Sequence, residues 1–553
     1  MIDYHEDSLK WIHGCIHGPT FRKEVVRALQ CGNGRILLNQ MDMRWCAVLF
    51  AVLTATLTCA PASQRAKWHY DRAQKVARVK KWHEATIECL VLGEFNSKAH
   101  PYSVQAIQML ALSSHTLGLS HRQFTMSGAA LRTAQALVLQ RLSYDHEKSR
   151  IQVSEEIALS TEANRRLWWN LAMSDWFSVS TTDMHCINPQ EFTTCRPRPY
   201  VSASCPGKET DEHPEAEVDY ANHFIDMATI LLESHTSTAA CIDPALSYEQ
   251  ILKYDARLRE LGAKGFNTRD TSQTWIPWAK SIERCAVGHK LIILHRSFLI
   301  RSFRDPSFSY TRWASIEGSK TIIKGCKEAF ADPNRPTIFV EQAWIISAGI
   351  TLCLDIMHRH EGETEYPEHF RLVEQAIACL DQCEDSVLAS RGRRLLLGML
   401  KERLTSSGFN NSGEWITQPS ETPNLLAGFD PILLEMGQAR GGPSWSGEAA
   451  ACGMHDSGLE SIVQLPTPET NSSLNLSMFE ESLTEEKILD PLHEDMSKQA
   501  PPAQTCFDDL FADPSWTDML SDFVPDLSAD ARCANLVTNG QVPLYHNGES
   551  VEP

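Results

Sequence analysis

The sequence predicts an all-α body followed by a long acidic tail. In the first 404 residues, apolar side chains recur at steps of three and four over many segments, as amphipathic helices require. The same region has no sustained period-two alternation and no Asn-Gly hairpin between β-branched runs, so strands are not expected. Beyond about residue 405, Ser, Thr, Pro, Gly, Asn and acidic residues dominate. Such a composition buries too little apolar surface to offset chain entropy, so we expect this tail to be disordered.

The net charge is unevenly divided along the chain of 553 residues. Residues 405–553 hold 24 acidic and four basic residues, whereas residues 1–404 hold 46 acidic and 47 basic ones. The formal charge of −19 is therefore a property of the tail, and the body is nearly neutral. The 17 cysteines are scattered, many of them within apolar runs. This usage indicates reduced thiols that act as small hydrophobes, not a disulfide framework.

The expected helices follow one another through the body. Residues 45–60, WCAVLFAVLTATLTCA, form an apolar run shorter than the roughly 20 residues of a membrane span, so we expect a buried helix and no membrane contact. Residues 101–119 begin with Pro101 and end near Gly118, which are start and stop signals of a helix. Residues 127–142 continue with one apolar face. Similar periodicity recurs over residues 155–177, 217–234, 279–303, 340–357 and 366–404.

One predicted helix, TEANRRLWWNLAMSDW over residues 161–176, combines charges with aromatic side chains. With Ser160 as its N-cap, Glu162 lies one turn before Arg165 and Arg166, a spacing that predicts ion pairs within the helix. The two arginines can also reach neighbouring indoles and stack on them.

The same helix has an apolar face that could either pack in the core or form a ligand-binding aromatic box. Trp169, Ala172, Met173 and Trp176 share this face. Such a stripe favours a core helix over a ligand-binding aromatic box. On a core helix, Asp175 is expected to be a buried or half-buried partner for an arginine and not a catalytic acid.

Residues that could bind metal or perform catalysis are few. His13 and His17 are four apart, but Gly14, Gly18 and Pro19 interrupt a helix there, so both histidines are expected to be structural. Cys379 and Cys383 are also four apart without a second pair, and are expected to form an apolar helix face. The sequence has no G-x-S-x-G frame, no P-loop and no strand followed by G-x-G-x-x-G. We therefore expect neither an enzyme nor a cofactor in this chain.

A basic segment, residues 64–84, holds seven lysines and arginines against Asp71 and Glu84. A nucleic-acid-binding helix has this character. A solvated helix face has it too, and is favoured here because apolar residues are mixed with the charges.

An acidic segment near the C-terminus, FDDLFADPSWTDMLSDFVPDL over residues 507–527, combines aspartates with bulky apolar side chains. Residues 507–530 contain seven aspartates and no base. Trp516, Leu520, Phe523 and Leu527 are spaced by four, three and four, so they would line one face of a helix formed on a partner. An inert solubilising tail is the alternative, but the spacing favours a transcriptional activation segment that binds coactivators. Its apolar residues are Phe507, Leu510, Phe511, Trp516, Met519, Leu520, Phe523 and Leu527.

Several stretches together resemble the fungal-specific transcription factor domain, the helical regulatory region of fungal zinc-cluster regulators. The resemblance spans about residues 11–350 and includes HGPTF, SVQAIQMLALSSHTLGL, SGAALRTAQALVLQRL, NRRLWWNLAMSDW and LIILHRSFL, in this order. The chain departs from the family motifs at four positions. Val138 stands where the family has glycine, Gln140 where it has histidine, Trp176 where it has arginine and Ser297 where it has proline.

The resemblance implies a nuclear transcription regulator in which the motif residues are structural. These residues are Glu162, Arg165, Arg166, Trp168, Trp169, Asp175, His295 and Arg296. The family binds DNA through an N-terminal module of six cysteines and two zinc ions, but no C-x-x-C occurs in this sequence. Three explanations stay open: a missing first exon that would supply the zinc cluster, a regulator that reaches DNA through another DNA-binding regulator, or DNA contact by an unrelated basic surface.

The sequence thus predicts four parts and one principal function. Residues 1–404 form the all-α regulatory domain, 405–500 a disordered linker, 501–530 the activation segment and 531–553 a disordered C-terminus. The expected protein is a nuclear fungal activator of a metabolic or secondary-metabolite biosynthetic pathway. A partner-dependent scaffold or corepressor is the first alternative, and an enzyme is the second and weaker one.

Overall fold

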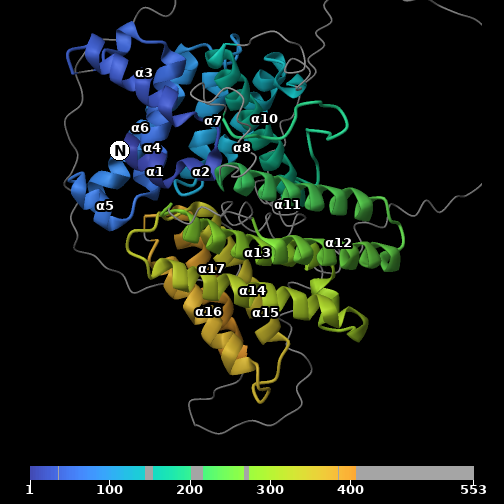
Figure 1. Cartoon of the computed structure of the whole chain (residues 1–553). Helices are drawn as coiled ribbons and strands as arrows, with labels where there is room; N and C mark the ends of the chain where they lie inside the picture. Colours follow the sequence, from blue (N-terminus) through green and yellow to red (C-terminus); the bar gives the residue numbers. More distant parts are fainter. Residues whose placement is uncertain (35, 143–153, 201–215, 267–272, 384, 407–553) are drawn as a thin grey trace, which may run out of the picture.

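A computed structural model shows the arrangement of the helical body (Figure 1). The structure describes residues 1–406 apart from 35, 143–153, 201–215, 267–272 and 384. Within these residues every regular element is an α-helix or a short 3₁₀ helix, which confirms the all-α prediction. The predicted linker, the activation segment and the C-terminal residues lie outside the described part of the chain.

The N-terminal half is built around a buried helix, α4. Its helices are α1 (Ile2–Ser8), α2 (Lys10–His13), α3 (Gly18–Cys31), η1 (Leu38–Gln40), α4 (Met43–Cys59), α5 (Ala62–Lys67), α6 (Arg72–Leu92), α7 (Pro101–Ser114), α8 (Ser120–Ala136) and η2 (Leu139–Arg141). Helix α4 packs against α6 and α7, and most of its residues are buried. Asp42 caps it, because a carboxylate oxygen accepts the Arg44 amide at 2.8 Å. The buried helix predicted over residues 45–60 is confirmed.

Two helix boundaries in this half differ from the predictions for a physical reason. Pro19 was expected to interrupt a helix, but a helix begins there. Pro19 lies in the first turn of α3, where its missing N–H leaves no hydrogen bond unmade. Helix α8 ends at Ala136 and not near residue 142, because Val138 adopts the left-handed conformation with φ of 59°. This is the position at which the resembling family has glycine, the residue that takes such a conformation without strain.

The C-terminal half consists of longer helices. They are α10 (Glu155–Thr182), α11 (Ala216–Ala239), α12 (Pro244–Lys264), α13 (Ile276–Ser302), η3 (Pro306–Phe308), α14 (Ser309–Phe330), α15 (Phe339–Met357), α16 (Tyr366–Asp381) and α17 (Val387–Ser406). The run predicted over residues 366–404 is thus two helices. The break is stabilised by Ser386, whose Oγ accepts the Ala389 amide at 3.3 Å and donates to Gln342 Oε1 at 2.6 Å.

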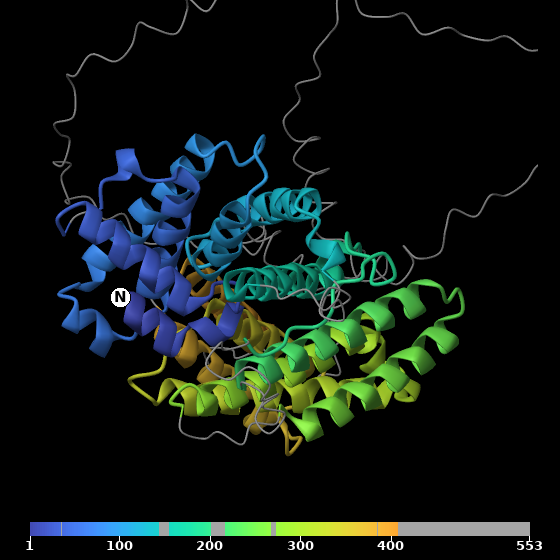
Figure 2. The same cartoon turned by 45° about the horizontal axis from the view of Figure 1, so that its top comes forward.

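Helix α10 joins the two halves. It contacts α7 and α8 on one side and α11 on the other, and α11 runs beside α12 (Figure 2). Helices α13 and α14 come close together at Gly288 and Gly318, where a Cβ built on Gly318 would lie 2.6 Å from the Gly288 carbonyl oxygen. These glycines allow the two backbones to touch.

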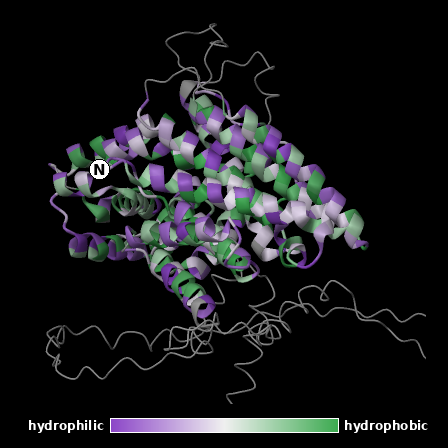
Figure 3. Ribbon diagram, turned by 90° about the horizontal axis from the view of Figure 1, so that it is seen from below, coloured by the Kyte–Doolittle hydropathy of each residue, from purple (hydrophilic) through white to green (hydrophobic). Residues whose placement is uncertain are grey.

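Polar and apolar residues are mixed along the helices in a way that fits packing around a common core. In Figure 3 purple and green residues alternate along most of the helices that are visible. Helix α15 is long and apolar enough to cross a membrane by length and composition alone. However, 78% of its apolar window is buried against the rest of the protein. Burial of this kind is what a core helix shows.

Candidate functional site

A buried ion cluster anchors the first half of α10. Helix α10 is capped by Ser154, and Ser160, the predicted N-cap, lies inside the helix. Glu162 pairs with Arg165, and its Oε1 accepts the Arg166 Nε at 3.2 Å and the Arg198 amide at 2.9 Å. The predicted ion pairs one turn apart are therefore present. Burial raises the pKa of Glu162, while the Arg198 amide and the two arginines oppose this shift.

The same helix binds the extended segment of residues 193–200. Trp169 Nε1 donates to the Cys195 carbonyl at 2.8 Å, and Arg166 Nη2 donates to the Arg198 carbonyl at 2.7 Å. The Arg166 guanidinium also lies 3.9 Å from the centroid of the Tyr200 ring. Trp168 is buried beside Phe192. These aromatic and charged side chains of α10 bind the segment of residues 193–200 to the helix.

Asp175 fixes the turn that follows α10. Its carboxylate accepts the amides of Cys186 at 2.9 Å and Ile187 at 2.8 Å, and Trp176 Nε1 donates to the Ile187 carbonyl at 2.8 Å. The predicted arginine partner of Asp175 is wrong, because the chain turns back after Asp183 and directs its backbone amides at the carboxylate. Burial raises the pKa of Asp175, and these amides oppose the shift.

His295 belongs to a second buried polar cluster, on α13. Its Nε2 donates to Asp255 Oδ1 at 3.1 Å, and its Nδ1 lies 2.9 Å from Thr311 Oγ1. Asp255 also accepts hydrogen bonds from Arg259 Nε and Tyr310 Oη, each at 2.8 Å. Burial alone raises the pKa of Asp255, but the hydrogen bonds from His295, Arg259 and Tyr310 outweigh it and lower the pKa to about 2.

Arg296 connects the two motif regions. Its Nη2 donates to the Ser180 carbonyl at 2.5 Å, in the last turn of α10, where carbonyls have no partner within the helix. Glu162 lies 18 residues before Ser180, which is roughly 27 Å along a helix. The eight motif residues therefore do not form one site. Most of them hold α10 at several points along its length, whereas His295 of α13 binds Asp255 of α12.

A cavity of about 250 Å³ lies beside the middle of α10. Its walls come from α2, α10, α11, α13 and α15, together with Gly14, Pro197 and Ile338 outside these helices. Trp169 and Met173 line it, whereas Ala172 and Trp176 are buried in the core. The same helix face thus contributes side chains both to the core and to the wall of the cavity.

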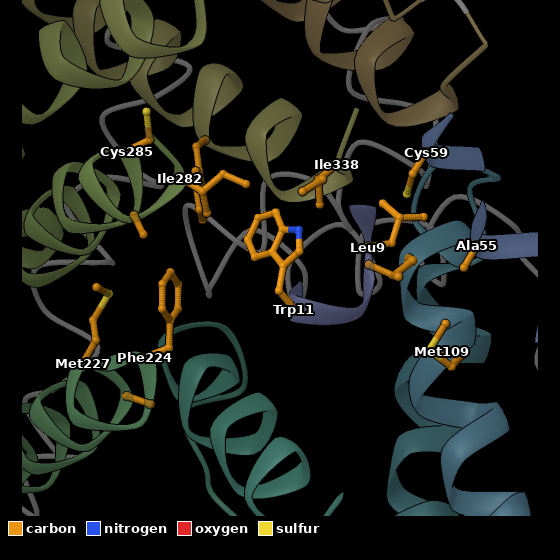
Figure 4. Packing of buried hydrophobic residues seen from close by; sticks show 14 of the residues in the cluster. Leu9, Trp11, Ala55, Cys59, Met109, Phe224, Met227, Ile282, Cys285 and Ile338 are labelled. Atoms are coloured by element: carbon orange, nitrogen blue, oxygen red, sulfur yellow. The ribbon is translucent and has the colours of Figure 1, made fainter. Parts of the chain in front are cut away.

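The view from close by shows how the other walls meet. In Figure 4 the Trp11 indole extends from α2 toward the space between Ile282 of α13 and Ile338, and the Phe224 ring of α11 points into the same region. Trp344 of α15 adds a further aromatic side chain. The lining is predominantly apolar and aromatic, as expected for a small-molecule site.

Besides Tyr220, four ionisable residues line the cavity: His13, Arg166, Glu217 and Lys290. His13 Nε2 lies 3.0 Å from His5 Nε2, and burial lowers the pKa of His13 well below its ordinary value, so this ring is neutral. Lys10 Nζ pairs with Glu217 at 3.0 Å. Lys290 is buried, with its Nζ 4.4 Å from the centroid of the Phe177 ring.

Sequence reasoning found only part of this cavity. Trp169 and Met173 were singled out, but Trp11, Trp344 and Lys290 come from helices more than 100 residues away and were missed. One signal was available: Lys290 directly precedes the apolar run LIIL of helix α13, residues 291–294, and is itself buried. A buried lysine in such a pattern is uncommon without a specific partner or function.

The other candidate sites predicted from the sequence have structural explanations. Among the residues that the structure describes, no group of three or more His, Cys, Asp and Glu is arranged to hold a metal ion. Cys379 and Cys383 are both buried, as expected for an apolar face. In the basic segment, Arg72 and Lys75 pair with Asp385 near the start of α17, which favours the interpretation as a helix face.

No family model matches the chain. The chain is 23% identical over 464 residues to the agnestins biosynthesis cluster transcription factor AgnL11 of Paecilomyces divaricatus. The match covers 76% of this chain and 64% of that protein, so the chain spans less than two thirds of the length of this relative. The chain is thus similar to a fungal transcription factor of a biosynthetic gene cluster.

Proposed function

We propose that this chain is a nuclear transcription regulator that activates a secondary-metabolite biosynthetic pathway. The similarity to a biosynthesis cluster transcription factor carries this proposal. The order of the motifs in the sequence supports it, because they resemble those of a helical regulatory region. The helical body is the regulatory part, and the acidic segment of residues 501–530 is the activating part.

The geometry of the motif residues fits a regulatory body better than a catalytic one. The motif residues Glu162 and Asp175 accept hydrogen bonds from arginines or backbone amides within the fold, and Asp255 accepts one from the motif residue His295. A catalytic carboxylate must instead reach a substrate. These side chains hold helices in fixed positions, on which partners or ligands can act.

The activating part acts through coactivators. Its aspartates keep the segment solvated and steer it toward basic surfaces, while Trp516, Leu520 and Phe523 supply apolar contacts. The body reaches promoters either by its own DNA contacts or through another DNA-binding regulator. A zinc cluster would belong to that DNA-reading function and not to the helical body.

A reporter assay tests the activating part. Residues 500–535 are fused to an unrelated DNA-binding module, and reporter transcription is measured for the native segment and for the variant Trp516→Ala, Leu520→Ala, Phe523→Ala. We expect strong activation by the native segment and a loss of more than about tenfold in the variant, since each buried large side chain contributes roughly 1.5–3 kcal/mol.

A matched variant controls for the effect of changing three residues of the segment to alanine. Ser515→Ala, Thr517→Ala and Ser521→Ala change three residues of the same stretch without altering its charge or its apolar face. This variant should activate like the native segment. Full activity of the Trp516, Leu520 and Phe523 variant would refute a helix-in-groove mechanism, and an inactive native segment would favour a scaffold or corepressor.

A further inference from the structure

We propose that the cavity beside α10 binds a planar aromatic small molecule that carries an acidic group, a carboxylate or a phenolate. Binding follows from the cavity itself, whereas the role of the ligand as a regulatory signal rests on the proposed function. The shape of the cavity, the nature of its walls and the charges in its lining support this proposal.

The walls favour flat aromatic rings. Five aromatic side chains from four different helices line the cavity: Trp11, Trp169, Trp344, Tyr220 and Phe224. Aromatic side chains attract other rings through stacked and edge-to-face contacts in addition to their apolar area. A ligand built of fused rings would therefore contact several walls at once.

The size limits the ligand. An apolar cavity of about 150 Å³ is enough for benzene, and drug-sized ligands occupy about 300–1,000 Å³. The cavity here, about 250 Å³, lies between these limits. It fits a ligand of about two fused rings with a small substituent.

The charges favour an anion. Lys290 brings a positive charge to the lining, Arg166 brings a second one that is paired with Glu162, and Glu217 brings one negative charge. Glu217 is already paired with Lys10 at 3.0 Å, and the neutral His13 adds no charge. Lys290 approaches the apolar wall beside Phe177, where the low dielectric strengthens its attraction to an anionic group. A carboxylate or phenolate on a ring system would meet both requirements of the site.

Such a ligand would connect distant parts of the fold. Trp11 belongs to the first dozen residues, whereas Lys290 and Trp344 belong to the C-terminal helices. A molecule between them contacts α2, α10, α11, α13 and α15 together. If one arrangement of these helices binds the ligand better than another, binding shifts the population toward it.

A binding experiment on the purified full chain tests the proposal. The probe is 2-naphthoic acid, compared with the neutral 2-naphthamide of similar shape. Binding is followed by quenching of tryptophan fluorescence, because three tryptophans line the cavity, and by the rise of the melting temperature. We expect the acid to bind at least about tenfold more tightly than the amide, because a charge-assisted hydrogen bond in a buried site supplies this difference.

Two variants assign the preference to the cavity. Lys290→Met keeps the length and apolar character of the side chain and should remove the preference for the acid while leaving amide binding intact. Lys280→Met, on the exposed side of the same helix, should keep it. Retained binding of the amide also shows that the Lys290→Met chain is folded.

Three results would overturn the proposal: equal affinities for acid and amide, an unchanged preference in Lys290→Met, or no binding of either probe at millimolar concentration. The segment of residues 500–535 used in the reporter assay does not include the cavity, and the binding assay requires neither DNA nor coactivator. Each hypothesis can therefore fail without the other.

Discussion

The buried carboxylate of Asp255 offers a quantitative test of how the second polar cluster stabilises the body. Its pKa of about 2 lies well below the ordinary value of 3.8. At about 1.4 kcal/mol per pH unit, this shift corresponds to a contribution of about 2 kcal/mol to the free energy of unfolding at neutral pH. Asp255→Asn keeps the shape of the side chain but removes the charge that holds His295 and Arg259. We expect it to lower the free energy of unfolding at pH 7 by about 2 kcal/mol.

The dependence on pH follows from the direction of the shift. A carboxyl whose pKa is lowered by folding stabilises the protein fully above its unfolded pKa, and this stabilisation is lost as the pH falls through the folded pKa. The difference between native chain and variant should therefore be constant from pH 7 to about pH 5. It should decrease to about half by pH 3, in the window between 3.8 and about 2.

Urea unfolding followed by circular dichroism measures both effects. Asp226→Asn is a suitable control, because its ion pair with Arg196 is at the surface, with 46% and 43% of the two side chains exposed. This control should change the free energy of unfolding by less than about 1 kcal/mol. An Asp255→Asn chain as stable as the native one at pH 7, or a difference that grows as the pH falls, would refute the reasoning.

Two further predictions concern backbone fit. Val138→Gly should raise the free energy of unfolding by up to about 1 kcal/mol, because an exposed β-branched residue gives up a left-handed conformation; a lower melting temperature would contradict this. Gly318→Ala should lower it by about 1–3 kcal/mol, because the new Cβ would lie 2.6 Å from the Gly288 carbonyl oxygen. Gly128→Ala, on α8 with nothing within 4 Å, is the matched control and should be neutral or stabilising in the same melting assay.

The sequence predicts contacts within one helix better than contacts between segments. The pairs of Glu162 with Arg165 and Arg166 were predictable because their partners lie one turn away. The amides that bind Asp175 and the ring beneath Arg166 depend on the course of the segment after α10, which no periodicity encodes. The family motif has glycine at the position of Val138, which hinted at an unusual backbone conformation there. The sequence difference alone did not show that Val138 is left-handed.

The cavity shows the same limit more strongly. A helical pattern placed Trp169 and Met173 on one face but gave no information on what lies opposite. Trp11 and Trp344 are 333 residues apart, and only the packing of the helices brings them to one space. Periodicity predicts which side of a helix is buried. It does not predict whether that side meets another helix or an empty volume.

The short helix α2 determines how the cavity can form during folding. A helix of four residues is not stable alone, so Trp11 depends on its contacts with Tyr220 and Trp275, at ring centroid distances of 5.1 and 5.3 Å. Its partners are synthesised more than 200 residues later. The cavity is therefore completed late, after long loops have closed. A fragment that lacks either the first dozen residues or helix α15 would keep much of its helical content and yet lose a wall of the cavity.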